Sequence, residues 1–336
     1  MNSRRHSNFI FFFISVIFTL IQNAGLSQKV IAQPQMYYSD SGVNKKPYAK
    51  DPYVVYFNNT YYMYYSIPGP QLKAWYIGIA SSNDLINWKK VGDIKPVEGF
   101  ESKGICAPSC LVKNGELHIF YQTYGNGKKD AICHAISTDG LHFQRDATNP
   151  IFIPTGKWNI GRAIDAEVVF YKNQYFLYFA TRDSSYTIQQ QGVAVTNANS
   201  NFSRDSWVQL SLDSAILKPQ LPWETKCLEA ASCIVKDGYL YMFYAGGYNN
   251  EPQQIGVAKS TDGLHWQRVF NEPILINGEK GTWNESESGH PNIFKDQKGR
   301  YHLFFQGNND KGNTWYLSKV EIGWNKKGPF IINKKR

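Results

Sequence analysis

Four ionisable side chains open similar short segments that lie far apart in the chain. Asp51, Asp165 and Glu229 carry carboxylates and His290 carries an imidazole, whereas a fifth such segment opens with Ala107. Two carboxylates across a pocket are suited to hydrolysing a glycosidic bond, because the ionised one activates water and the protonated one gives its proton to the leaving oxygen. A third carboxylate between them raises the pKa of the acid by like-charge repulsion. We therefore predict one acidic site built from these residues.

No other catalytic signature competes with this set. The sequence has no G-x-S-x-G turn, no H-E-x-x-H pair, no phosphate-binding P-loop and no dinucleotide-binding glycine motif. Its five cysteines lack the spacing of a tetrahedral zinc site, and the Cys106-x3-Cys110 pair is better explained by strand packing. An organic cofactor is therefore not expected.

Internal repetition indicates how the ionisable residues are brought together. Each of the five segments contains a short apolar strand, a polar turn and an aromatic-rich strand, as in DPYVVYFNNTYYMYYS and DAEVVFYKNQYFLYFAT. The turns are those expected of β-hairpins. They are Asn58-Asn59, Asn114-Gly115, Lys172-Asn173, Asp237-Gly238 and Lys298-Gly299.

Further strands follow each hairpin. A glycine-containing third strand is expected at 76–81, 131–137, 191–196, 254–260 and 314–320. In four repeats a turn and an aromatic residue then open a fourth strand, at Trp88, Phe143, Trp207 and Trp266. No stretch shows sustained helical periodicity. The sequence thus predicts an all-β, five-bladed β-propeller with four antiparallel strands per blade; a β-sandwich is the alternative.

The first strand of each propeller blade lines the central channel, so the opening residues matter most. A polar turn follows each of them at a similar distance, and we expect all five to occupy equivalent places at the channel entrance. The alternative for any single aspartate is a turn-capping role. Three carboxylates and a histidine at matching positions favour the channel.

Residues just before three of these strands are candidates for substrate binding. Trp158 and Arg162 precede Asp165, Trp223 precedes Glu229, and Glu287 precedes His290. A tryptophan in such a loop can stack on a sugar face, and Glu287 can contact a sugar hydroxyl or a metal's water shell. Packing between blades is the competing role for each tryptophan. Trp88 and Trp266 recur at one turn position, which favours a structural role for both.

The two ends of the chain differ from its centre. Arg4 and Arg5 precede an apolar run that is short for a membrane span, which predicts a signal peptide over 1–32 and a single propeller domain over 33–336. The alternative is an uncleaved anchor. We expect an exported protein, periplasmic or extracellular, with no membrane span after cleavage. The formal charge of +9 is concentrated at the ends, and without a basic stripe no nucleic-acid partner is expected.

Taken in order, the motifs KDPYVVYF, SSNDLINW, AIDAEVVF, LEAASCIV and SGHPNIFK resemble those of glycoside hydrolase family 43 over about residues 45–320. This resemblance implies an exported, inverting enzyme of the arabinofuranosidase or xylosidase kind, acting on plant or algal oligosaccharides or polysaccharides. Asp51 would be the general base, Asp165 the residue that orients the acid and tunes its pKa, and Glu229 the general acid. His290 would help to hold a calcium ion in the channel.

Several motifs depart from the family pattern. The second blade reads Cys106-Ala107-Pro108-Ser109 where the family has Trp-Ala-Pro-Asp, and Glu229 is followed by two alanines in place of Gly-Pro. The neighbouring family 117, whose members act on agar oligosaccharides, is therefore an alternative that would make His290 the acid. Families 32 and 68 fit less well because their motifs are absent. The changed second blade also leaves open a non-catalytic, carbohydrate-binding propeller.

Overall fold

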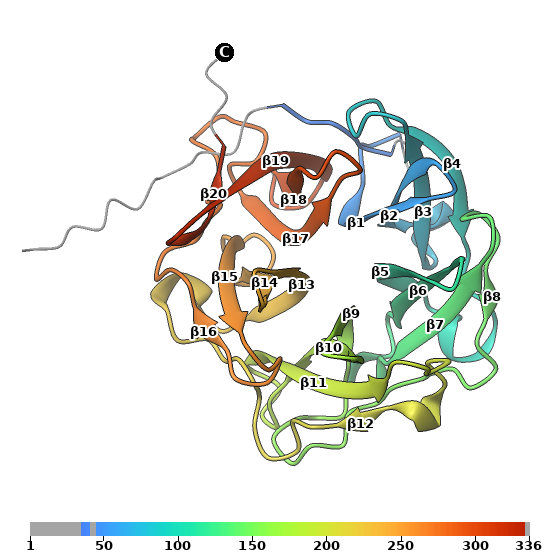
Figure 1. Cartoon of the computed structure of the whole chain (residues 1–336). Helices are drawn as coiled ribbons and strands as arrows, with labels where there is room; N and C mark the ends of the chain where they lie inside the picture. The colour runs from blue at the N-terminus through green and yellow to red at the C-terminus, as the bar shows by residue number, and fades with distance from the viewer. Residues whose placement is uncertain (1–34, 41–44, 333–336) are drawn as a thin grey trace, which may run out of the picture.

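Five four-stranded antiparallel sheets form a ring around a central channel (Figure 1). The computed structural model describes residues 35–40 and 45–332. Each sheet is one blade, and its strands follow one another in sequence order from the channel to the rim. The predicted all-β five-bladed propeller is confirmed, and the β-sandwich alternative is wrong.

The strands of the blades have the following bounds. Blade 1 contains β1 (Lys50–Phe57), β2 (Thr60–Pro68), β3 (Trp75–Ser82) and β4 (Lys89–Ile94). Blade 2 contains β5 (Ile105–Lys113), β6 (Glu116–Thr123), β7 (Ile132–Ser137) and β8 (Gln144–Arg145). Blade 3 contains β9 (Ile164–Tyr171), β10 (Gln174–Arg182), β11 (Gln189–Asn197) and β12 (Val208–Gln209). Blade 4 contains β13 (Leu228–Lys236), β14 (Tyr239–Gly246), β15 (Gln254–Ser260) and β16 (Gln267–Arg268). Blade 5 contains β17 (Glu287–Lys295), β18 (Tyr301–Asn308), β19 (Tyr316–Asn325) and β20 (Gly328–Ile331).

Helical structure in the described residues is limited to single 3-10 turns in the connections. These turns are η1 (Pro70–Leu72), η2 (Gly99–Glu101), η3 (Gly127–Lys129), η4 (Arg204–Ser206) and η5 (Pro222–Glu224). No helix in this part of the chain is long and apolar enough to span a bilayer. The predicted signal peptide over 1–32 lies outside the described residues.

The hairpin turns have the conformation that their residues predict. Both central residues are left-handed in the first two blades: φ is 48° and 60° at Asn58 and Asn59, and 53° and 80° at Asn114 and Gly115. Two consecutive residues with positive φ are typical of the type I′ turn, whose twist matches that of the flanking strands. The turns therefore set the register between the first two strands of these blades.

Aromatic residues at the start of the fourth strand pack against the neighbouring blade. Trp88 of blade 1 contacts Phe304 of blade 5, and Trp266 of blade 4 contacts Tyr178 of blade 3, both edge to face. In the turn before Trp266, the Asp262 carboxylate accepts the backbone N–H groups of Leu264 and His265. Trp88 and Trp266 are thus structural, as predicted.

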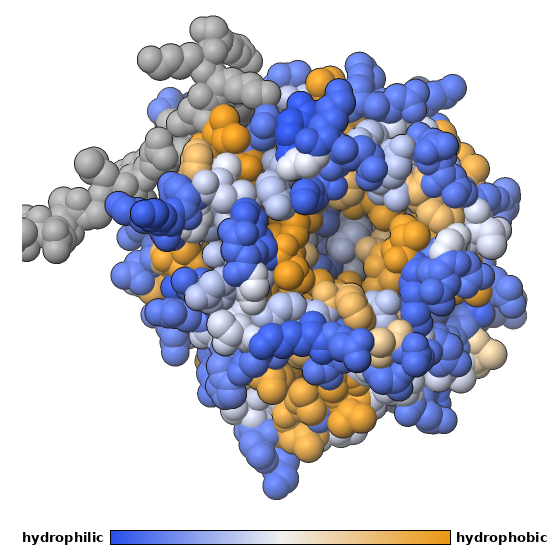
Figure 2. Space-filling model, viewed as in Figure 1, coloured by the Kyte–Doolittle hydropathy of each residue, from blue (hydrophilic) through white to orange (hydrophobic). Residues whose placement is uncertain are grey.

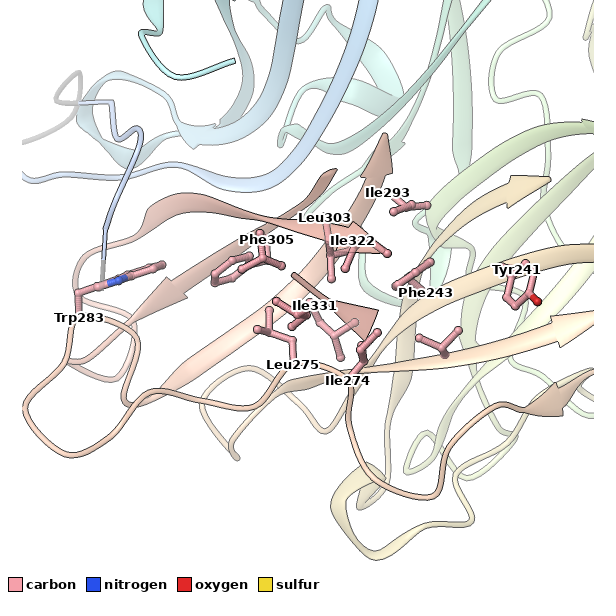
Figure 3. Packing of buried hydrophobic residues seen from close by; sticks show 13 residues of the cluster. Tyr241, Phe243, Ile274, Leu275, Trp283, Ile293, Leu303, Phe305, Ile322 and Ile331 are labelled. Carbon is pink, nitrogen blue, oxygen red and sulfur yellow. The ribbon is translucent and has the colours of Figure 1, made fainter. Parts of the chain in front are cut away.

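Apolar side chains fill the space between adjacent blades. Figure 3 shows the cluster between blades 4 and 5, which includes Phe243 of β14 and both Leu303 and Phe305 of β18. All three side chains are fully buried. The ring is tied together near its ends by the segment before blade 1, since the Tyr37 N–H donates to the Leu317 carbonyl of β19 at 2.9 Å.

The channel itself contains a layer of polar side chains on the inner strands. Glu167 of β9 is buried there and bridges several blades. One of its oxygens accepts the Cys233 N–H of blade 4 at 2.6 Å, and the other accepts the Ser109 hydroxyl of blade 2 at 3.1 Å. The Tyr53 hydroxyl of blade 1 is a further hydrogen-bond partner. Glu167 therefore connects four of the five blades across the channel.

Candidate active site

A β-bulge interrupts every inner strand close to its first residue. In β1 the register with β2 shifts between Lys50 and Tyr53, and equivalent shifts occur in the other four blades. One residue of each bulge has a positive φ of 46–52°, a conformation that non-glycine residues rarely adopt. These residues are Asp51, Ala107, Asp165, Ala230 and His290. Bulges turn a side chain away from the regular alternation of the strand, here at one end of the channel.

One of the five predicted equivalences is wrong. Ala230, and not Glu229, has the positive φ in blade 4, and Glu229 still pairs regularly with Ala245 of β14. Glu229 is therefore equivalent to Lys50, which precedes Asp51. The hairpin turn begins eight residues after Glu229 and seven after Asp51, but it also begins eight residues after His290, so this spacing does not reveal the offset. Asp51, Asp165 and His290 do occupy equivalent positions.

Asp51 lies beside His290, and both side chains are almost completely buried. The His290 Nδ1 is 3.1 Å from Asp51 Oδ1. The Asp51 backbone N–H donates to Gln306 Oε1 at 2.8 Å, which fixes the strained peptide. Burial alone would raise the pKa of the Asp51 carboxyl, but His290, Lys50 and a hydrogen bond from Ser66 outweigh it and leave this pKa below its usual value. Asp51 is therefore ionised at neutral pH.

Asp165 has the opposite protonation preference. Burial, together with the nearby charges of Glu229 and Asp51, raises the pKa of its carboxyl well above the ordinary value, against the opposing effects of Arg162 and Lys50. The three carboxylates are thus close enough to interact through their charges. The structure brings together the three residues that were selected from the sequence as catalytic, and burial beside like charges favours the protonated form of Asp165.

Glu229 is held by two glutamine side chains. Gln189 of β11 donates through Nε2 to Glu229 Oε2, and Gln253 donates through Nε2 to Glu229 Oε1 at 2.6 Å. Gln253 also accepts the His290 backbone N–H at 3.1 Å. Neither glutamine was selected from the sequence, where no motif marks them. Both lie in or beside the third strand of a blade, away from the repeated opening segments.

Arg162 and Glu287 take part in the network around the carboxylates. Arg162 pairs with Asp130 at 3.5 Å and donates to Gln189 Oε1 at 3.4 Å, so it supports the residue that binds Glu229. Glu287 is buried and accepts hydrogen bonds from Gln306 at 2.6 Å and from the Asn250 N–H at 2.7 Å. Burial raises the pKa of Glu287 to about 8. Both residues lie at the site, and both have protein partners.

The two tryptophans proposed to bind substrate contact the protein. The indole of Trp158 donates to the Ser211 carbonyl at 2.7 Å, beside the outer strands of blade 3 and not at the inner strand. Trp223 stacks on Tyr244 with ring centres 5.9 Å apart. It also covers Gly246 and Gly256, where an added Cβ would approach the ring to 2.3 and 2.6 Å. These contacts match the packing alternative for both residues.

Lys50 and the aromatic rings of Tyr48, Trp75 and Trp315 also lie at the site, although they were not selected from the sequence. The Lys50 Nζ lies 4.4 Å above the Trp315 ring and donates to Asn249 at 2.9 Å. Its charge interacts with Asp51, Glu287 and Glu229. Trp315 and Trp75 both pack against Tyr48. Lys50 directly precedes Asp51, which was the available signal. Figure 2 shows a hollow at the centre of the ring on the face in view.

The residues around His290 do not fit a calcium ion held by protein ligands. Among the described residues, no group of three or more His, Cys, Asp or Glu side chains is arranged to hold a metal. His290 directs Nδ1 towards Asp51, and calcium prefers oxygen ligands. The geometry instead matches a histidine that is hydrogen-bonded to a carboxylate. The calcium ion expected in the channel stays a prediction.

Known structures share this architecture. An endo-1,4-beta-xylanase from Bacteroides thetaiotaomicron superposes with a TM-score of 0.69 at 20% identity, covering 91% of this chain and 97% of that one. An alpha-L-arabinofuranosidase from Lactobacillus brevis gives a TM-score of 0.65 at 15% identity, covering 91% and 96%. At such identities the likeness shows the fold.

Comparison of sequences identifies the family of the chain more specifically than superposition of structures does. A sucrose-6-phosphate hydrolase from Zymomonas mobilis is 31% identical over 105 residues, which is 28% of this chain and only 20% of that protein. The sequence model of glycosyl hydrolases family 43 matches residues 45–328, which include every strand before β20 and the three carboxylates Asp51, Asp165 and Glu229. With the propeller and its ring of carboxylates, this match shows that the chain belongs to glycosyl hydrolases family 43, a family of inverting glycosidases.

Proposed function

We propose that this protein hydrolyses glycosidic bonds of plant or algal oligosaccharides or polysaccharides, with Asp51 as the general base and Glu229 as the general acid. The observation that carries the proposal is the opposite behaviour of two neighbouring carboxyls. His290 and Lys50 lower the pKa of the Asp51 carboxyl, whereas burial and like charges raise the pKa of the Asp165 carboxyl. Pairs of carboxyl groups pushed in opposite directions are typical of acid–base sites.

Each residue then has a defined task. Ionised Asp51 takes a proton from a water molecule that attacks the anomeric carbon. Glu229, whose carboxylate is oriented by Gln189 and Gln253, gives a proton to the leaving oxygen. The raised pKa of the neighbouring Asp165 favours a proton on this side of the site. Because water attacks from the side opposite the leaving group, the configuration at the anomeric carbon inverts.

The position of His290 supports Glu229 as the acid over the family 117 alternative. An inverting acid and base lie on opposite sides of the scissile bond, about 6.5–9.5 Å apart. His290 contacts Asp51 directly at 3.1 Å, so both groups lie on the same side of the substrate. Burial also lowers the pKa of His290, which leaves it neutral at neutral pH. Its role in the proposal is to orient Asp51 through the Nδ1 contact, and its charge favours the ionised carboxylate only at acidic pH, where His290 itself takes up a proton.

The expected substrates are arabinofuranosides or xylosides. This expectation rests on the xylanase and arabinofuranosidase among the similar structures. Export to the periplasm or the extracellular space, with the signal peptide over 1–32, is part of the same proposal because polymeric saccharides are degraded outside the cytoplasm. A propeller that only binds saccharides would not need two neighbouring carboxyls whose pKa values are shifted in opposite directions.

A substrate panel tests the proposal. Nitrophenyl glycosides of arabinofuranose, xylose and galactose are incubated with the protein, in parallel with arabinan, xylan and agar oligosaccharides. We expect hydrolysis, with the inverted anomer formed first by NMR. Asp51→Asn should reduce the rate by on the order of 10²–10⁴-fold, since the variant lacks the proposed base. Saccharide binding without hydrolysis, or retention of configuration, would refute the assignment.

A further inference from the structure

Arg182, at the end of β10, lacks the partners that the other described arginines have. Four of the six described arginines form ion pairs with carboxylates, namely Arg145, Arg162, Arg268 and Arg300. Arg204 donates to the backbone carbonyls of Asn149 and Pro150. Arg182 donates only through Nε, to Gln189 Oε1 at 3.3 Å, and no described carboxylate lies within ion-pair distance of it. Its two terminal nitrogens therefore remain available.

The guanidinium of Arg182 is nevertheless held in place. Its central carbon lies 4.4 Å from the ring centre of Tyr186 and 5.2 Å from that of Tyr248. Cation–π contacts with two rings limit the motion of the side chain, so less entropy is lost when a ligand binds. Tyr248 is itself anchored by a hydrogen bond from its hydroxyl to the Thr187 carbonyl at 3.1 Å.

Nearby charges do not neutralise Arg182. The charge of Arg182 acts on the neighbouring Asp183 and helps to lower its pKa. The Asp183 carboxylate, however, accepts hydrogen bonds from the Ser185 hydroxyl and from the backbone N–H groups of Thr187 and Ile188. A second cation lies close by, because the Lys128 Nζ is 5.5 Å from the Tyr186 ring centre. Two cations thus contact the Tyr186 ring beside the acidic centre, and neither forms an ion pair with a carboxylate of the described residues.

Arg182 lies on the side of the candidate acid. It pairs with Gln189 across β10 and β11, and Gln189 donates in turn to Glu229. Tyr248 feels the charges of both Arg182 and Glu229, which places the two groups around one hydroxyl. Asp51, the proposed base, contacts His290 of β17 instead. The sugar that accepts the proton of Glu229 as it leaves would therefore lie against Arg182.

We propose that Arg182 binds an anionic group on the leaving sugar, either a carboxylate or a sulfate or phosphate ester. The inference rests on the proposed function, since it takes Glu229 as the acid. A planar guanidinium with two free N–H donors matches the paired oxygens of such groups. Arg182 then selects acidic saccharides, whereas the catalytic carboxylates act on the bond itself.

Binding of single sugars tests this without requiring turnover. Galacturonate, glucose 6-sulfate and glucose 6-phosphate are titrated calorimetrically at low salt, with galactose and glucose as the neutral controls. We expect at least one acidic sugar to bind the native protein on the order of 10- to 100-fold more tightly than its neutral parent. The sugar that shows this preference identifies which anion is recognised.

Variants assign the preference to one residue. Arg182→Gln should abolish the difference between acidic and neutral sugars, and Arg182→Lys should keep part of it because the charge remains without the planar fork. Arg300→Gln, which removes an equal charge at a distant hairpin, should leave the difference unchanged. Equal binding of acidic and neutral sugars by the native protein, or a preference that survives in Arg182→Gln, would overturn the proposal.

A kinetic arm separates this inference from the proposed function. For a glycoside cleaved in the panel, kcat/KM is compared between a 4-carboxyphenyl and a 4-carbamoylphenyl leaving group. We expect a higher ratio of the two for the native protein than for Arg182→Gln. Hydrolysis with the same ratio in both proteins would refute the role of Arg182 and leave the glycosidase intact. Absence of hydrolysis would refute the proposed function, while the calorimetry would still decide whether Arg182 binds anions.

Discussion

Glu167→Gln is expected to flatten the pH dependence of stability. Burial raises the pKa of Glu167 from 4.5 to about 8, although the hydrogen bonds from Cys233, Tyr53 and Ser109 favour the ionised form. Between these two pH values the native protein holds a proton that the unfolded chain releases. The stabilisation is therefore complete at low pH and is lost as the pH rises towards 8.

The size of the effect follows from the shift. One pKa unit corresponds to about 1.4 kcal/mol, so the native protein should lose roughly 5 kcal/mol of unfolding free energy from this group between pH 4.5 and pH 8. Glutamine has the shape of the protonated acid and does not titrate. The carbonyl oxygen of the glutamine can accept the Cys233 N–H. The hydroxyls of Tyr53 and Ser109 can rotate to accept hydrogen bonds from its NH₂ group.

Urea unfolding at pH 5, 6, 7 and 8 measures the difference between native protein and variant. The unfolding free energy of Glu167→Gln minus that of the native protein should rise by about 1.4 kcal/mol per pH unit across this range. Glu98→Gln, which changes an exposed side chain, serves as the control and should give a constant difference. Parallel curves for Glu167→Gln and native protein would show that Glu167 is already ionised in the fold, contrary to this reasoning.

Three further predictions concern the catalytic group. Glu229→Gln should slow substrates with poor leaving groups far more than activated aryl glycosides, which need little proton donation; if His290→Ala gives that pattern instead, His290 is the acid. His290→Ala should also raise the pKa of Asp51, so that kcat/KM, which requires ionised Asp51, begins to fall at a higher pH as the solution is acidified. Chelation with verified metal removal tests the calcium ion expected from the sequence, which should be needed for full activity and be replaced by added calcium but not by zinc; unchanged activity and melting temperature would reject the ion.

The blades were predictable because their signals are local. Asn58-Asn59 and Asn114-Gly115 specify tight turns, and alternating apolar residues specify the strands on either side. The fourth strands begin directly after Trp88 and its counterparts, as predicted. Repetition then made the ring predictable, since five similar units of this kind close only as a propeller.

The candidate site was predictable only for residues within the repeats. Asp51, Asp165 and His290 share one backbone position, but Glu229 is offset from it by a bulge whose exact place depends on pairing with β14. Gln189, Gln253 and Arg182 reach the site from second and third strands and their connections. Their contribution follows from how the blades are oriented in space, which no local pattern encodes.

Trp158 and Trp223 illustrate a related limit. A tryptophan before a channel strand is equally suited to a sugar and to the edge of its own blade. The choice for Trp223 depends on Gly246 and Gly256, which leave a flat surface for the ring. These glycines belong to the second and third strands of blade 4. The residues that determine where the Trp223 ring packs therefore lie outside the segment that contains Trp223 and Glu229.

The bulge at the start of each inner strand offers a route to new chemistry on this scaffold. Ala107 and Ala230 adopt φ values of 48° and 52°, although a methyl group gains nothing from the unusual conformation. A non-glycine residue in this region costs on the order of 1–3 kcal/mol, and the ring supplies that energy at every blade, whatever the side chain. Both alanines are thus preformed attachment points. A carboxylate, thiol or imidazole introduced there would share the backbone geometry of Asp51, so that a protein engineer could add functional groups around one axis by single substitutions.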